Sequence, residues 1–98
     1  MVRHVVMFKF EGDDRERLEV ALKFKEALEA LPSQIEVLQS IEVGLNMNPA
    51  EAWDLVLTAT VASFPDVATY SAHPAHVDAC KIIAGHKKDR ACVDYAVD

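Results

Sequence analysis

The chain has 98 residues, 51% of them hydrophobic, and its sixteen acidic and ten basic residues give a formal net charge of −6. A chain of this length is expected to fold as one domain over residues 1–98. The acidic balance argues against nucleic acid as a partner, and no apolar run reaches the roughly 18 residues of a membrane span.

The first third of the chain predicts a strand followed by a helix. Alternation over residues 2–10 places four side chains on one face of the strand, namely His4, Val6, Phe8 and Phe10. Asp13 and Glu16 then have the spacing of a capping box. The helix that follows is expected to run to Leu31, with an apolar stripe of Leu18, Ala21, Leu22, Phe24, Ala27, Leu28 and Leu31.

Two further strands are expected in the middle of the chain. The first contains the alternating residues Ile35, Val37, Ile41 and Val43, and a turn rich in Asn follows over residues 44–49. The second covers residues 53–61, with one face formed by Trp53, Leu55, Leu57, Ala59 and Val61.

A helix broken in its middle is expected next. Ser63 is a candidate N-cap for a short helix over residues 65–72. His73 precedes Pro74 and is therefore biased away from helical geometry, so a second helix begins at Pro74. Gly85 is expected to stop that helix, whose apolar face is formed by Val77, Cys80, Ile83 and Ala84.

A final strand over residues 91–97 places Cys92 and Asp94 on the face opposite Val93 and Tyr95. The order is therefore β-α-β-β-α-β, the split arrangement of an α+β ferredoxin-like fold with a four-stranded antiparallel sheet. Helices are expected to cover one sheet face. The other face stays apolar, which predicts a homodimer formed through the open face of the sheet.

The segment from Tyr70 to His76 gathers a phenol and two of the chain's four histidines into seven residues. Imidazole moves protons near neutral pH, and a phenol can hold a carbonyl or enolate oxygen by a hydrogen bond. The segment is therefore a candidate acid–base site. A metal site is not expected, because Pro74 disturbs the helix that would align His73 with His76 and no zinc pattern is present.

Five segments together resemble the stress-responsive dimeric A/B barrel family, called Dabb, over essentially the whole chain. The opening residues 2–10 and the segments Ile41–Asn46 and Ala52–Leu57 carry part of the resemblance. The His-Pro-x-His element within 70–76 and the Asp-Tyr pair within 91–95 carry the rest. The resemblance implies a dimer in which two sheets close into an α/β barrel, and it implies no single function.

Members of this family include proteins without an assigned activity, plant proteins that accumulate under stress, and a cofactor-independent plant polyketide cyclase of the olivetolic acid cyclase type. Matching to the cyclase implies that Tyr70 and His76 are catalytic, that Asp94 holds His76, and that His4 lies in the pocket. A pocket histidine of the third strand is replaced by Asp54, and residues of the first helix also differ. The resemblance therefore does not imply the same substrate.

In the catalytic interpretation His76 is a general base oriented by Asp94, and Tyr70 donates to the oxygen on which charge develops. In the structural interpretation a His76–Asp94 pair is a buried clamp, and Tyr70 and His4 belong to the core. The candidate ligand-binding residues between sheet and helices are His4, Phe24, Leu28 and Phe64, of which the last three could instead fill the space.

Three functions stay open: binding of a small apolar or carbonyl ligand, with a possible association with stress; a cofactor-independent cyclase or isomerase; and a purely structural assembly module. No metal or cofactor is expected in any of them. Met1–His4 lacks the apolar core of a signal peptide, and Cys80 and Cys92 are expected to be reduced thiols, so the expected location is the cytoplasm.

Overall fold

The computed structural model describes all residues of the chain, Met1–Asp98. Its helices and strands follow the order β-α-β-β-α-β, with the second helix divided in two and a short 3-10 helix, η1, after the first. The elements are β1 (Val2–Phe10), α1 (Asp14–Glu29), η1 (Leu31–Ser33), β2 (Ser40–Leu45), β3 (Leu55–Val61), α2 (Pro65–Ala72), α3 (Pro74–Cys80) and β4 (Lys87–Ala96).

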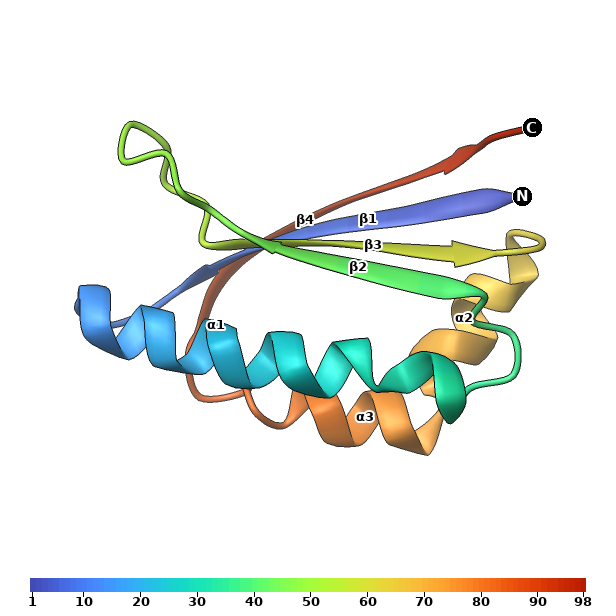
Figure 1. Cartoon of the computed structure of the whole chain (residues 1–98), viewed down its shortest axis with the longest axis horizontal. Coiled ribbons are helices and arrows are strands. Elements are labelled where there is room, and N and C mark those ends of the chain that lie inside the picture. Colours follow the sequence, from blue (N-terminus) through green and yellow to red (C-terminus); the bar gives the residue numbers. More distant parts are fainter.

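The four strands form one antiparallel sheet in the order β2-β3-β1-β4. All three α-helices lie on the same side of this sheet, and its other face carries no helix (Figure 1). This is the predicted ferredoxin-like arrangement. None of the helices is long and apolar enough to cross a membrane.

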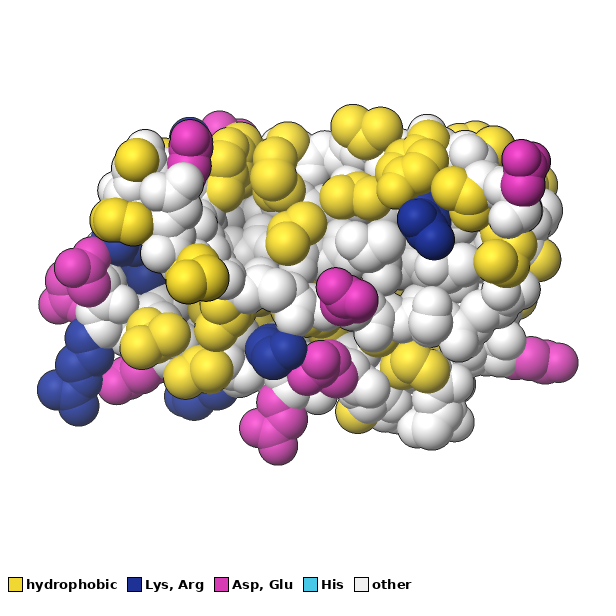
Figure 2. All heavy atoms as spheres, turned by 45° about the horizontal axis from the view of Figure 1, so that its top comes forward, with side chains coloured by type: hydrophobic (Ala, Val, Ile, Leu, Met, Phe, Trp, Pro, Cys, Tyr) yellow, Lys and Arg dark blue, Asp and Glu magenta, His cyan; other side chains and the backbone are white.

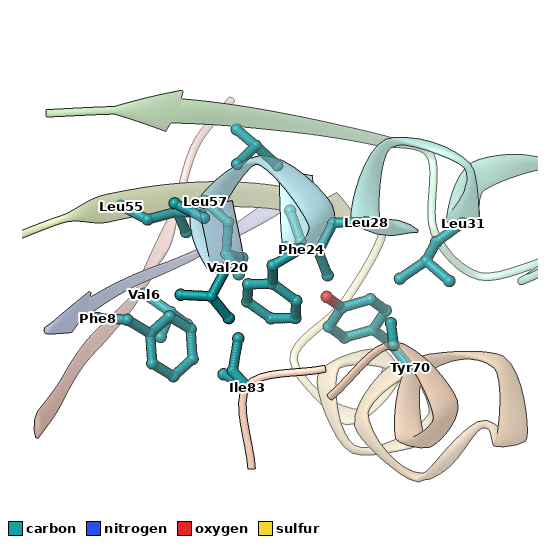
Figure 3. Packing of buried hydrophobic residues seen from close by; sticks show 14 of the residues in the cluster. Val6, Phe8, Val20, Phe24, Leu28, Leu31, Leu55, Leu57, Tyr70 and Ile83 are labelled. Atoms are coloured by element: carbon teal, nitrogen blue, oxygen red, sulfur yellow. The ribbon is translucent and has the colours of Figure 1, made fainter. Parts of the chain in front are cut away.

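The core lies between the helices and the inner face of the sheet, as Figure 3 shows. Strand alternation is confirmed, because Val6, Phe8 and Phe10 of β1 and Leu55, Leu57, Ala59 and Val61 of β3 are all buried. Helix α1 contributes Val20, Ala21, Phe24 and Leu28. Each large side chain buried in this way stabilises the fold by about 1.5–3 kcal/mol.

The start of α1 follows the prediction, but its buried face does not. Asp13 accepts a hydrogen bond from the amide of Glu16 at 2.8 Å, and the Glu16 carboxylate accepts one from the amide of Asp13 at 3.3 Å, which completes the capping box. Leu18 and Leu22, predicted to be buried, are 53% and 50% exposed. Residues two apart lie about 200° apart around a helix, so both point away from the buried face that contains Val20 and Phe24.

Several predicted boundaries are wrong. Strand β2 begins at Ser40, because the chain after Pro32 first forms η1 and a turn in which the Leu38 amide bonds to the Ile35 carbonyl. Strand β3 begins at Leu55 rather than 53, and β4 begins at Lys87 rather than 91.

The broken helix also differs from the prediction in three places. Phe64, not Ser63, is the N-cap of α2, and the Ser63 hydroxyl instead lies 3.2 Å from the Asp66 carboxylate. Helix α3 ends at Cys80, before Gly85, and Val77 is 46% exposed. The break itself is confirmed, because His73 is extended and its Nδ1 accepts a hydrogen bond from the Ala75 amide at 3.0 Å.

Candidate functional site

A cavity of about 330 Å³ lies between the inner face of the sheet and helices α1, α2 and α3. Apolar side chains of the sheet and of α1, including Val6, Phe8, Phe24 and Leu57, form much of its wall. The polar or charged side chains that border it are His4, Tyr70, Ser71, His76, Lys87 and Arg90. A mostly apolar cavity of this size with a few convergent polar groups is typical of a small-molecule site.

A larger and more open depression of about 680 Å³ lies at the end of β1, beside the loop from Asn46 to Asp54. Arg17, one of its cations, is already paired, because it contacts Asp14 at 2.6 Å and Asp54 at 3.2 Å. Asp54 also accepts a hydrogen bond from the Phe10 amide at 2.8 Å. These side chains hold α1, β1 and the loop together, so the smaller cavity is the better candidate site.

Tyr70 borders the cavity and has a buried hydroxyl. Its side chain, from α2, is only 1% exposed, and its hydroxyl has no hydrogen-bond partner in the protein. Figure 3 shows the hydroxyl directed from α2 toward the side chains of Phe24 and Leu28. Burial raises the pKa of Tyr70 well above its ordinary value, so the phenol stays protonated and remains a donor.

His76, on α3, borders the same cavity, and its ring centroid lies 4.5 Å from that of Tyr70. Nδ1 lies 2.9 Å from the Ser71 carbonyl oxygen. Because a carbonyl only accepts, Nδ1 carries the hydrogen and Nε2 keeps the lone pair of the neutral ring. Burial lowers the pKa of His76, which keeps the ring neutral near pH 7. The protein contact of Nε2 is the thiol of Cys80, at 3.5 Å.

His4, not His76, is the histidine bound by Asp94. The His4 Nδ1 lies 2.5 Å from the Asp94 carboxylate, whereas His76 bonds to Ser71. The predicted His76–Asp94 pair is therefore wrong. The physical reason is strand register: residues 4 and 94 are direct partners in the β1–β4 ladder, while His76 lies on the helical wall.

Cys92 adds a possible metal-ligand set next to this pair. Its sulfur lies 3.5 Å from the His4 Nδ1, and the ligand atoms of His4, Cys92 and Asp94 lie within 4.8 Å of one another. The hydrogen bond to Asp94 uses the same ring nitrogen that would bind the ion. A metal would therefore have to displace that hydrogen bond, so the arrangement fits a hydrogen-bonded pair better than a metal centre.

Of the predicted site residues, His4, Phe24, Tyr70 and His76 border the cavity, and Asp94 contacts it through His4. The other two do not border it. Leu28 lies in the core with 0% exposure, and Phe64 is 64% exposed at the start of α2. Leu28 instead fills the core, which was the alternative left open by the sequence, and a role of either residue beside a ligand stays a prediction.

Sequence reasoning did not assign Ser71, Cys80, Lys87 or Arg90 to the site, although all four border the cavity. Cys80 could have been found, because it lies one helical turn after His76 and Sγ–ring contacts are expected at that spacing. Burial raises the pKa of its thiol, and the nearby Lys87 and Arg90 partly oppose that shift. The alternation of apolar and polar residues does not indicate that Lys87 and Arg90 border a cavity.

Comparison with solved structures gives close matches to the whole chain. A dimeric protein of unknown function with a ferredoxin-like fold from Bacteroides fragilis is 49% identical with a TM-score of 0.94, covering 98% of this chain and 95% of that chain. A dimeric ferredoxin-like protein of unknown function from Thermobifida fusca is 26% identical with a TM-score of 0.79, covering 98% and 90%.

A hydroxynitrile lyase from Passiflora edulis has a TM-score of 0.75 over 99% of this chain and 93% of that chain, and its identity of 14% shows a shared fold alone. A comparison with curated proteins returned no significant match. The model of the stress responsive A/B barrel domain matches residues 2–97. The chain therefore belongs to the stress-responsive A/B barrel (Dabb) family.

Proposed function

We propose that this protein binds a small, mostly apolar carbonyl compound in the cavity between the sheet and the helices. The observation that carries the proposal is the hydroxyl of Tyr70, which is buried, protonated and without a partner in the protein. A buried donor left unpaired costs about 1–3 kcal/mol. A ligand carbonyl oxygen that accepts from this hydroxyl would recover that cost, while the apolar wall takes the rest of the ligand.

A matched pair of ligands tests whether Tyr70 recognises a ketone oxygen. Methyl 4-oxo-4-phenylbutanoate and methyl 4-phenylbutanoate differ only in having a ketone or a methylene group at one carbon. The wild-type protein is expected to bind the ketone more tightly by about three- to tenfold, the value of one neutral hydrogen bond. Tyr70→Phe is expected to abolish this preference when both dissociation constants are measured by calorimetry. An equal preference in wild type and variant would refute the proposed role of Tyr70.

A second candidate is a cofactor-independent enzyme of the cyclase or isomerase type. It is favoured by the neutral ring of His76, whose Nε2 keeps its lone pair, lying against the Tyr70 phenol in the same cavity. His76 could take a proton from a carbon beside a carbonyl while Tyr70 donates to the oxygen. His4, whose Nδ1 is bound by Asp94, is the alternative base because a carboxylate raises the basicity of the other ring nitrogen.

Exchange of the α-protons of methyl 4-oxo-4-phenylbutanoate in deuterated water, followed by NMR, tests this candidate. If the protein accelerates exchange, His76→Ala is expected to lower the rate by about 10²- to 10⁴-fold, the usual contribution of a general base. Asp94→Asn is the matched comparison, because its side chain contacts His4 and not His76. A rate unaffected by His76→Ala but lost in Asp94→Asn would transfer the role of base to His4.

We also propose that two copies of the chain associate through the outer face of the sheet. Val93 and Tyr95 on β4 are 63% and 42% exposed there, and Val56 on β3 is 36% exposed. Hydrophobic side chains gather across the upper part of Figure 2, where this face comes forward. The two similar proteins described as dimeric support a homodimer. A location in the cytoplasm and an association with stress stay predictions.

A further inference from the structure

An irregularity in strand β4 brings two cations to the cavity. The β1–β4 register runs evenly as far as Lys9 opposite Asp89 and then shifts, so that Phe10 lies opposite Lys87 and Lys88 is left as the extra residue of a bulge. In a regular strand Lys88 would share a face with Arg90, and Lys87 would point to the other side. The bulge reverses this order, so Lys87 and Arg90 both border the cavity while Lys88 borders the separate depression at the end of β1.

These two cations have no anionic partner in the protein. Neither Lys87 nor Arg90 forms an ion pair, and no aspartate or glutamate borders the cavity. The chain has sixteen acidic and ten basic residues, so two unpaired cations beside one cavity do not follow from its net charge. Both side chains are exposed, so they lie where the cavity meets solvent.

The remaining polar groups lie deeper. Tyr70 is fully buried and His76 is half-buried, and the field of Arg90 contributes to the lowered pKa of His76, although burial is the main cause. The cavity therefore has a mostly apolar wall with Tyr70, His4 and His76 inside and two unpaired cations at its mouth. Guanidinium and ammonium groups at such a mouth are suited to an oxyanion, and the guanidinium can bind a carboxylate with two parallel hydrogen bonds.

We propose that Lys87 and Arg90 form an anion-binding subsite, and that the ligand is an apolar carbonyl compound that also carries a carboxylate. The apolar body and the carbonyl occupy the interior beside Tyr70, and the carboxylate stays at the mouth between the two cations. This inference rests on the proposed ligand-binding function, and it adds the charge of the ligand and the residues that select it.

The test compares 4-oxo-4-phenylbutanoate with its methyl ester, which has the same body and no charge. Dissociation constants are measured by calorimetry for the wild type and for Arg90→Gln, Lys87→Gln and Lys88→Gln. The wild type is expected to bind the acid more tightly than the ester by about three- to tenfold. Arg90→Gln and Lys87→Gln are expected to reduce that preference, and Lys88→Gln, the neighbouring lysine outside the cavity, is expected to keep it.

Salt provides an independent readout. Raising NaCl to about 0.5 M shortens the Debye length to about 4 Å and is expected to weaken binding of the acid but not of the ester. If acid and ester bind equally, or if Lys88→Gln acts as strongly as Arg90→Gln, the anion subsite is refuted and the carbonyl site stands. If neither compound binds to the wild type, the carbonyl site is refuted and the anion subsite falls with it.

Discussion

His4 on β1 and Asp94 on β4 face each other directly in the antiparallel ladder, and the His4 Nδ1 lies 2.5 Å from the Asp94 carboxylate. The imidazole is 8% exposed and the carboxylate 25% exposed, so the pair joins the buried side of the sheet to its edge strand. The two imidazoles that border the cavity therefore have different hydrogen-bond partners. His4 is held by a carboxylate, and His76 is held by the backbone carbonyl of Ser71.

Removing the carboxylate is expected to destabilise the fold. Asp94→Ala leaves a buried imidazole nitrogen without its partner, which costs about 1–3 kcal/mol in the free energy of unfolding. Asp78→Ala is the control, because its ion pair with Lys81 is exposed at both ends and such pairs contribute about 0–1 kcal/mol. Urea denaturation of both variants measures the difference. Equal effects would mean that the His4–Asp94 contact is as weak as a surface pair.

Replacing Tyr70 by Phe is expected to stabilise the protein when no ligand is present. The substitution removes a hydroxyl that has no partner and leaves the ring in place. The expected gain in the free energy of unfolding is about 1 kcal/mol, measured by urea denaturation. Ligand binding should weaken in the same variant. A loss of stability in Tyr70→Phe would show that the hydroxyl has a structural partner.

His76 is expected to make the fold less stable in acid. Its pKa is lowered in the folded state by burial, so below its ordinary value of 6.5 the unfolded chain binds a proton more readily than the folded chain. The free energy of unfolding therefore falls as the pH drops below that value, and this part of the pH dependence is absent above it. The fall ends once the pH is below the folded pKa.

The variant His76→Gln removes the titrating ring. Denaturation at about pH 7.5 and about pH 5.5 is expected to show a smaller loss of stability in the variant than in the wild type. An identical pH dependence in His76→Gln and the wild type would contradict the burial effect.

A charge on the outer face of the sheet is expected to prevent dimerisation. Val93→Glu places a carboxylate on the outer face of the sheet, and burying this charge between two copies is costly. Sedimentation at micromolar concentration is expected to show a dimer for the wild type and a monomer for this variant. Leu22→Glu changes a similarly exposed residue on α1 and should remain dimeric.

Much of the fold follows from local patterns that do not depend on distant contacts. The alternation around Val6 and Phe8 reveals a strand with one buried face, and the spacing of Asp13 and Glu16 marks the start of α1. The proline after His73 divides the second helix. By contrast, the burial of Val20 in place of Leu18 depends on how α1 rotates against the sheet, which a broad apolar stripe does not specify.

The site was less predictable because it depends on register. Tyr70, His76 and His4 stand out by residue type, and all three border one cavity. The partner of Asp94 is decided by which residue of β1 lies opposite it, and strand alternation alone leaves that choice open. Lys87 reaches the cavity only because β4 has a bulge, and nothing in the spacing of its charged residues reveals that bulge.

The most direct test of the ligand-binding cavity is an NMR titration of protein carrying ¹³C-labelled tyrosine and histidine rings with methyl 4-oxo-4-phenylbutanoate. The chain has two tyrosines, and Tyr95 lies on the outer face of the sheet, so it is an internal control. Saturable shifts of the Tyr70 and His76 ring signals, with Tyr95 unchanged, are the predicted result. Shifts confined to Tyr95, or none at Tyr70 and His76, would contradict a carbonyl-binding site between the sheet and the helices.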